Sequence, residues 1–274
     1  MKKTLACVFL IVINVVEVNA HNTFLKFKSH YLTPQTEVLV SLMNGTFEKS
    51  ENSIALRRMQ DVRIVGPKQQ GEQPNSSQWR LTKNLNLLHF KTGEQGTYVV
   101  GVSIKPRMIE MSAKDYNKYL KHDGVLDILD ARRKSGQLGR KVKEKYSKHV
   151  KALFQVGEKR TEDFGQVFDY PIEIIPQQNP FSLSVGDTLP VKVLFNGKLV
   201  KNQLIYASYE GFHKHDEDGG HVEAVHTRTN KNGSAHIKLG HKGRWYVRLI
   251  HMVASKEKGV DYESNWATLT FEIK

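Results

Sequence analysis

The chain has 274 residues, and its 41 lysine and arginine residues against 28 aspartate and glutamate residues give a formal net charge of +13. This length is sufficient for two modest domains or one large β domain. Cys7 is the only cysteine, so the sequence excludes an intramolecular disulfide, and a metal site would need histidine, carboxylate, methionine or amine ligands.

Residues 1–20 have the features of a cleavable secretory signal peptide. Two lysines form a basic start, residues 5–16 form an apolar run too short to span a bilayer comfortably, and Val18-Asn19-Ala20 offers a cleavage site. We therefore expect a periplasmic or secreted protein whose mature chain begins at His21. Nucleic acid is not an expected partner there, and the positive charge favours solubility or contact with an anionic envelope surface.

The segments that follow alternate or run apolar over four to eight positions, which is typical of short antiparallel strands. They are residues 36–45, 60–67, 85–92 and 96–104, and Asn-Gly, Gly-Pro and Gly-Glu-Gln-Gly sequences punctuate them. The pattern resumes in residues 151–157 and 171–176. It predicts an N-terminal β-sandwich domain over residues 21–176.

A segment with helical periodicity interrupts this β-rich part. Ser112 followed by Asp115 resembles the capping box at the start of a helix. The apolar residues that would share a helical face are Val125, Ile128 and Leu129 in one group and Val142, Tyr146 and Val150 in another. We expect a small helical insertion over residues 112–149 that caps one end of the sandwich, and a helical arm for a partner is the alternative.

A stretch with three prolines, residues 171–181, marks a domain boundary, and residues 177–274 predict a second sandwich with a His-rich loop. Asn196-Gly197 and Asn232-Gly233 are strong hairpin turns. The succession of strands around them is Ig-like or transthyretin-like. The predicted fold is therefore mainly β, with two Ig-like or transthyretin-like β-sandwich domains and a small helical insertion.

Twelve histidines are many for this length, and the densest stretch is "YEGFHKHDEDGGHVEAVH". His213 and His215 lie on one side of an extended chain, three carboxylates follow, and His221 begins the next strand. Three imidazoles and three carboxylates at one loop form a natural polydentate site for Ni, Cu, Zn or Co. A solvated hairpin tip without metal is the alternative.

Two further histidines are candidate ligands. A terminal His21 would combine an α-amine with an imidazole, and such a pair chelates metal. His251 ends the apolar strand face of Val247 and Leu249, and is either a satisfied core histidine or a ligand near the end of a sandwich. The predicted metal ligands are His21, His213, His215, His221 and His251. The motifs of serine hydrolases, nucleotide-binding loops and zinc proteases are not present, so we predict a binding protein and not an enzyme.

Several segments of the chain match a known family. These are Ala20-His21 followed by "FLKF", then "GTYVVGVSIKPR", "KYSKHVKALFQVG", "PIEIIPQQNPFSLSVGDTL", "GRWYVRLIHM" and "ESNWATLTFEIK". With them the sequence resembles the exported domain-of-unknown-function family 4198, periplasmic proteins associated with nickel and cobalt uptake (the NikM-like group). The resemblance implies a periplasmic β-sandwich protein that binds a divalent transition metal for an importer in the inner membrane. It also implies that His21 and the C-terminal histidines are ligands.

One departure leaves the metal open between Ni, Co and Cu. Nickel carriers of the related membrane type have histidine at the second mature position, where amine, backbone amide and imidazole form a square-planar site. Here histidine comes first, which favours a two-nitrogen chelate as in copper histidine-brace proteins. Two alternatives therefore remain: a copper oxygenase-like enzyme with a histidine brace, and a metal-free module that binds the envelope.

Overall fold

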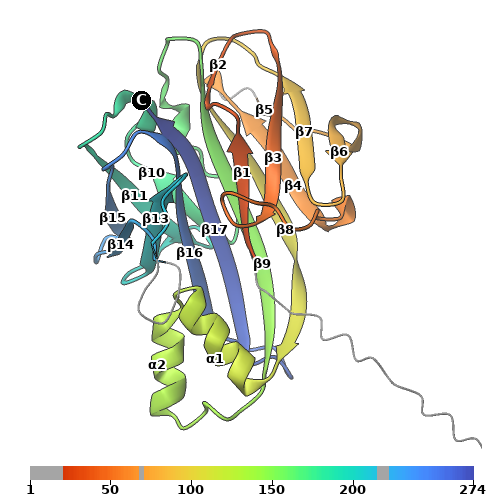
Figure 1. Ribbon diagram of the computed structural model, residues 1–274, viewed down its shortest axis with the longest axis vertical. Coiled ribbons are helices and arrows are strands. Elements are labelled where there is room, and N and C mark those ends of the chain that lie inside the picture. The colour runs from red at the N-terminus through yellow and green to blue at the C-terminus, as the bar shows by residue number, and fades with distance from the viewer. Residues whose placement is uncertain (1–20, 68–70, 215–221) are drawn as a thin grey trace, which may run out of the picture.

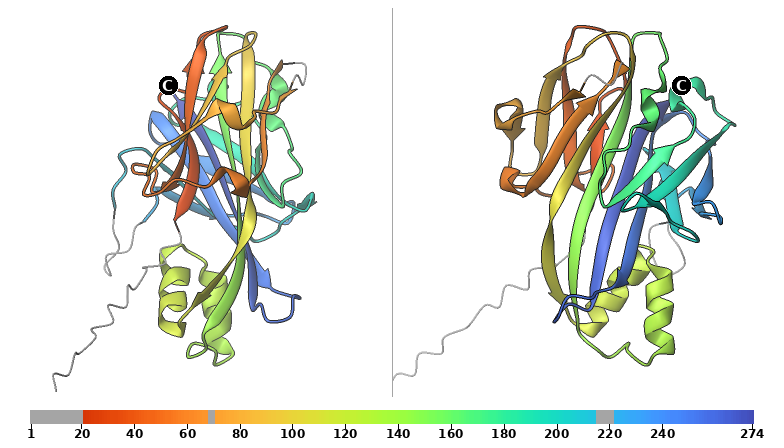
Figure 2. Two further views of the ribbon diagram at one scale, coloured as in Figure 1. Left: turned by 90° about the vertical axis from the view of Figure 1, so that its right-hand side faces the viewer. Right: turned by 180° about the vertical axis from the view of Figure 1, so that it is seen from behind.

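The computed structural model describes residues 21–67, 71–214 and 222–274. Over these residues the protein is mainly β, with three β-sheets and two α-helices, so the predicted fold class is confirmed. A long central sheet carries a smaller sheet on each face, and the helices lie at its lower end (Figures 1 and 2). No helix in the described part of the chain is long and apolar enough to cross a membrane.

The central sheet has nine strands drawn from both halves of the chain. Its order is β14 (Val225–Arg228), β13 (Leu204–Tyr209), β16 (Gly243–Ala254), β17 (Tyr262–Ile273), β9 (Val142–Val156), β8 (Gly96–Met111), β4 (Met59–Val65) and β5 (Gly71–Glu72), with β2 (Tyr31–Leu32) beside β9. The pairing of β17 with β9 is parallel, from Tyr262 opposite Glu144 to Thr270 opposite Ala152. This pairing joins the N-terminal and C-terminal halves into one sheet.

The N-terminal small sheet is antiparallel and covers one face of the central sheet. Its order is β1 (Asn22–Phe27), β3 (Glu37–Gly45), β7 (Asn86–Lys91) and β6 (Trp79–Leu81). Side chains of β17 hold its edge strand β1, since the hydroxyls of Thr268 and Thr270 donate to the carbonyls of Thr23 and Leu25 at 2.8 and 2.5 Å. Residue 21, directly before β1, is thereby placed over the central sheet.

The C-terminal small sheet covers the opposite face. It contains β10 (Ile172–Pro176), β11 (Thr188–Phe195), β12 (Lys198–Leu199) and β15 (Ser234–Lys238). The domain boundary predicted between residues 176 and 177 falls directly after β10, and β10 pairs with β11. The strand before the boundary and the strands after it therefore belong to one sheet.

Alternation of side chains along the central strands separates two apolar cores. Val247 and Leu249 of β16 pack in the core beneath the C-terminal small sheet. Val100, Val102 and Phe154, from β8 and β9, pack in the core beneath the N-terminal small sheet. Because successive strand residues point to opposite faces, one long sheet supplies both cores.

The two helices are α1 (Ala113–His122) and α2 (Leu126–Lys134), and their start is as predicted, because the Ser112 side chain accepts a hydrogen bond from the Asp115 amide. Gly124 separates them with a φ of +75°, and its carbonyl accepts a hydrogen bond from the Tyr206 hydroxyl at 3.1 Å. A side chain at position 124 would collide with the Tyr206 ring. The remaining helical turns are η1 (Leu56–Arg58), η3 (Ser76–Gln78), η4 (Glu162–Gly165) and η5 (Pro180–Ser182).

The predicted helical insertion over residues 112–149 is wrong in its last part, because residues 142–149 begin strand β9. Val142, Tyr146 and Val150 are spaced by four residues, which satisfies the helical period. The same spacing is a multiple of two, so these side chains also share one face of a strand. Pairing with β8 and β17 decides between the two periods.

Two buried histidines make the stability of this fold depend on pH. Burial lowers the pKa of His30 and of His149 to about 4. The unfolded chain takes up these protons near pH 6.5, whereas the folded protein resists them until about pH 4. The stabilisation is therefore present above pH 6.5 and is lost as the pH falls through this interval.

We predict that each histidine lowers the free energy of unfolding by about 3 kcal/mol between pH 6.5 and 4. The imidazole nitrogens of His149 lie 3.0 and 2.9 Å from the hydroxyls of Ser103 and Ser147. The uncharged glutamine of a His149→Gln variant keeps hydrogen-bonding groups there, so it should remove the part of the pH dependence that His149 contributes, about 3 kcal/mol between pH 6.5 and 4. Urea unfolding at several pH values measures the free energy of unfolding as a function of pH. If that free energy changes with pH in the variant as it does in the unaltered protein, His149 is not the source of the pH dependence.

Candidate functional site

His21 lies at the entrance to β1, where its side chain and its backbone are both held. Its Nε2 is 3.1 Å from Oε2 of Glu51. Its carbonyl accepts a hydrogen bond from Nζ of Lys148, which also donates to Oδ1 of Asn44 at 3.1 Å. The residue that would become the mature terminus is thus fixed from two sides.

Lys148 is an unusual anchor because it is buried in an aromatic environment. Its amine lies 5.3 Å from the ring centroid of Trp266 and 5.9 Å from that of Tyr146. Desolvation lowers its pKa to about 7. No carboxylate forms an ion pair with it among the described residues. The His21 carbonyl and the Asn44 amide oxygen are its hydrogen-bond acceptors.

The turn after β3, residues 46–51, connects His21 with the base of the His-rich loop. Glu51 at its end contacts His21, as described. Glu48 accepts a hydrogen bond from the backbone amide of Gly211 at 2.8 Å, two residues before His213. One short turn therefore reaches both candidate ligand segments.

The described part of the His-rich loop consists of its two ends. His213 is exposed, and the amide of Val222 donates to the carbonyl of Lys214 at 2.9 Å, which closes the base of the loop. His215 and His221, together with the three acidic residues between them, lie outside the described residues. The structure thus fixes where the loop leaves and rejoins the sheet.

A buried ion pair ties the far end of the loop to α1. Arg248 of β16 donates from Nε to Oε1 of Glu223 at 2.6 Å, and its guanidinium lies 4.7 Å from the Tyr206 ring centroid. It also donates from Nη1 to the carbonyl of Asp123, the residue after α1, at 2.9 Å. The loop base, the end of α1 and His21 consequently share one face of the central sheet.

His251 lies on the other face and is not part of a site with His21. Its ring packs 4.5 Å from that of Phe195 in the C-terminal small sheet, and its Nδ1 is 2.9 Å from Oε1 of Gln203. Burial lowers its pKa. Side chains alternate along β16, so His251 follows Leu249 into that core. Of the two interpretations of this residue, the structure favours the satisfied core histidine.

In the described part of the chain, no three histidine, cysteine or carboxylate side chains are close enough to hold a metal together. His89–Glu37 and His122–Asp123 are histidine–carboxylate pairs there, and the pair at a candidate ligand is the His21 imidazole with the Glu51 carboxylate. Cleavage after Ala20 would add an α-amine next to that imidazole. The amine and imidazole Nδ1 of one histidine form a chelate that suits Cu, Ni, Co or Zn, and Glu51 contacts the other ring nitrogen, Nε2.

Glu51 and Lys148 were not identified from the sequence. Glu51 lies in a polar turn and carries no motif. The sequence does contain an indication of Lys148, because it lies at every-second-residue spacing with Tyr146, Val150 and Ala152. These residues share the inward face of β9. A lysine at an inward position of an apolar strand indicates a specific buried partner.

Comparison with known proteins identifies a family but no described function. A domain of unknown function (DUF4198) matches residues 18–253. No curated protein matches the chain.

Solved structures similar to the chain have low TM-scores. The D0-D1 domain of Intimin is 12% identical with a TM-score of 0.21, and the alignment covers 92% of this chain and 97% of that one. The Yersinia pseudotuberculosis adhesin InvE is 10% identical with a TM-score of 0.22, over 91% and 58% of the two chains. A DUF4785 family protein from Legionella pneumophila is 10% identical with a TM-score of 0.25, over 81% and 50%.

The Arg248–Glu223 pair gives a stability test of the link between the loop and α1. An Arg248→Met substitution leaves the Glu223 carboxylate buried without its counter-ion. We predict a loss of about 3–5 kcal/mol in the free energy of unfolding. The double variant Arg248→Met/Glu223→Leu should recover most of this loss, because neither charge remains. Urea denaturation measures both, and a double variant as unstable as the single one would contradict this account.

Proposed function

The chain belongs to the DUF4198 family, and we propose that it is an exported protein that binds a divalent transition metal at the mature N-terminus. The ligands would be the α-amine and the imidazole Nδ1 of His21 and imidazoles of the His-rich loop, while Glu51 would hold the His21 ring through Nε2. Ni, Co and Cu are the candidate metals. The protein would capture the metal outside the inner membrane and deliver it to an importer there.

One observation carries this proposal: the turn of residues 46–51 contacts His21 through Glu51 and the base of the His-rich loop through Glu48. The two groups of candidate ligands are separated by almost two hundred residues in sequence. Their meeting on one turn supports a shared site. Glu51 contacts Nε2 of His21, which leaves Nδ1 for a chelate with the terminal amine, and a carboxylate on the far nitrogen commonly orients a metal-binding histidine.

The anchoring of the terminus by Lys148 gives further support. A flexible terminus would lose conformational freedom on binding a metal, and that loss weakens affinity. Here the backbone of residue 21 is already held through its carbonyl. The imidazole of the same residue is held separately, with its Nε2 3.1 Å from Oε2 of Glu51.

The first experiment tests the terminus. We expect the mature chain beginning at His21 to bind Cu²⁺, Ni²⁺ or Co²⁺ in calorimetric titrations. His21→Ala, or acetylation of the terminal amine, should weaken binding by about tenfold or more, because each change removes one nitrogen of the chelate. His236→Ala is the matched control, since His236 is exposed on β15 in the C-terminal small sheet.

Two results would exclude His21 as a terminal metal ligand. Equal affinity in all of these proteins would refute a terminal ligand. Mass spectrometry of the exported protein must also find His21 at the N-terminus, since cleavage elsewhere removes the amine from the site.

A second experiment tests whether the loop contributes to the same ion. Substituting His213, His215 and His221 together by alanine should weaken binding by about tenfold or more, and a copper spectrum should lose nitrogen couplings. Combining this change with His21→Ala should give less than the sum of the two losses in free energy, as expected for ligands of one ion. Additive losses with a stoichiometry of two metals would instead indicate two separate sites.

A further inference from the structure

The lower half of β8 is an open edge of the central sheet. β4 pairs with β8 only as far as Ile104, whereas β8 continues to Met111 alongside β9. A bulge between Ile104 and Arg107 marks the point where β4 departs. Beyond it, no described strand lies on the outer side of β8, and this part of the strand borders the molecule (Figures 1 and 2).

Side chains of other elements contact two further edge strands, β1 and β14. At β1, the hydroxyls of Thr268 and Thr270 donate hydrogen bonds to the backbone carbonyls of Thr23 and Leu25. At β14, Arg228 forms a bidentate ion pair with Asp127 of α2, two bonds of 2.8 Å. On the lower part of β8, one backbone contact from outside is found in the described chain, from Arg58 to the Lys105 carbonyl at 3.1 Å.

The open part has the length of a short strand. It runs from Arg107 to Met111, and strands of about five residues are the most common. Pro106 limits it at one end because proline offers no N–H to a neighbouring strand. At the other end the chain turns into α1. In an antiparallel pair, every second residue directs its N–H and C=O away from its partner, so groups remain for an added strand.

The charges along this edge are mainly positive. Lys105 and Arg107 are exposed and form no ion pair among the described residues. The carboxylate at this edge, Glu110, is already bound to Lys141 at 2.8 Å. That hydrogen bond with Lys141 lowers the pKa of Glu110, so it carries its charge in the pair.

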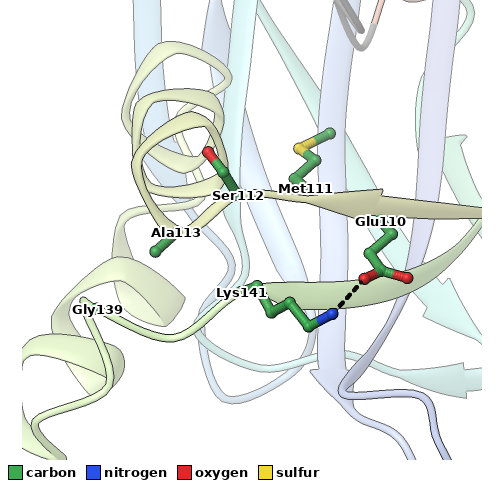
Figure 3. A pocket seen from close by; sticks show the side chains of 6 residues that line it. All are labelled: Glu110, Met111, Ser112, Ala113, Gly139 and Lys141. Carbon is green, nitrogen blue, oxygen red and sulfur yellow. Dashed lines mark hydrogen bonds and ion pairs between the residues drawn. The ribbon is translucent and has the colours of Figure 1, made fainter.

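A hollow of about 590 Å³ lies where the edge ends. It is lined by Glu110, Met111, Ser112, Ala113, Gly139 and Lys141 (Figure 3). A second hollow of about 420 Å³ shares Glu110 and Lys141 and adds Arg140, Lys143 and Asp261. Arg140 pairs with Asp261 at 2.9 Å, while the Lys143 side chain has no ion pair within the described chain. The second hollow is thus lined by three cations, Arg140, Lys141 and Lys143, and by two carboxylates, Glu110 and Asp261.

We propose that this edge, Arg107 to Met111, binds an extended acidic segment of a partner protein as an added strand. Main-chain hydrogen bonds would hold the segment, and an acidic side chain in the hollow would meet Lys143. A second copy of this chain is a poor occupant, because both copies would bring Lys105 and Arg107 to the contact and each carries a net charge of +13. This inference is independent of the proposed metal site.

The test uses three synthetic hexapeptides and the mature protein. The first alternates glutamate and valine, the second replaces each glutamate by lysine, and the third replaces alternate valines of the acidic peptide by proline. We expect the acidic strand-forming peptide to bind and to shift and protect the backbone amides of residues 107–111 in NMR spectra. The basic and the proline-containing peptides should bind about tenfold more weakly or not at all.

Two double variants distinguish binding at this edge from general attraction to the positive charge of the protein. Arg107→Glu/Lys143→Glu should weaken binding of the acidic peptide by about tenfold or more. The matched control is Lys91→Glu/Lys238→Glu, at exposed strand positions of the two small sheets, and should leave binding within about twofold. Thermal unfolding of both variants shows whether each remains folded.

Three outcomes would overturn the proposal. Equal binding of the acidic and proline-containing peptides would show charge attraction without strand addition. Binding that shifts amides elsewhere, or that the control variant weakens equally, would exclude this edge. No binding of the acidic peptide at millimolar concentration would also refute it.

Discussion

The parallel pairing of β17 with β9 is the constraint on which the rest of the structure depends. It joins the last strand of the chain to one near its middle, and makes one sheet from two sets of strands. Both apolar cores then lie on opposite faces of that sheet. The same pairing brings Thr268 and Thr270 beneath β1, so the position of the N-terminus is set by the C-terminal strand.

The face of β9 that results is apolar at one end and contains buried ionisable groups at the other. Glu144 and Lys148 lie four residues apart, and desolvation raises the pKa of Glu144 to about 7 and lowers that of Lys148 to about 7. Tyr119 and Ser264 donate hydrogen bonds to Glu144, yet its Oε2 is buried without a partner among the described residues. Groups of this kind cost stability, and they concentrate at functional sites.

The sequence was sufficient for the fold class, but not for the shared central sheet or for the site. Period-two patterns and Asn-Gly turns predicted the strands, and the cap at Ser112 predicted α1. The pattern at Val142 and Tyr146 fits both periods, and only pairing with neighbouring strands resolves it. Contacts such as Glu51 with His21 join residues through the fold, so no local pattern contains them. The sequence left His251 open between a core histidine and a ligand, because a sequence does not show which core a strand face enters.

The two proposed surfaces are neighbours through β9. Arg107, at the start of the open edge, lies opposite Tyr146, whose ring is near the amine of Lys148. Lys148 in turn holds the His21 carbonyl. A strand added to β8 would therefore lie two strand positions from the terminus that is proposed to bind metal. Delivery of the metal and docking of an acidic partner are thus compatible on one side of the molecule, although each is tested separately.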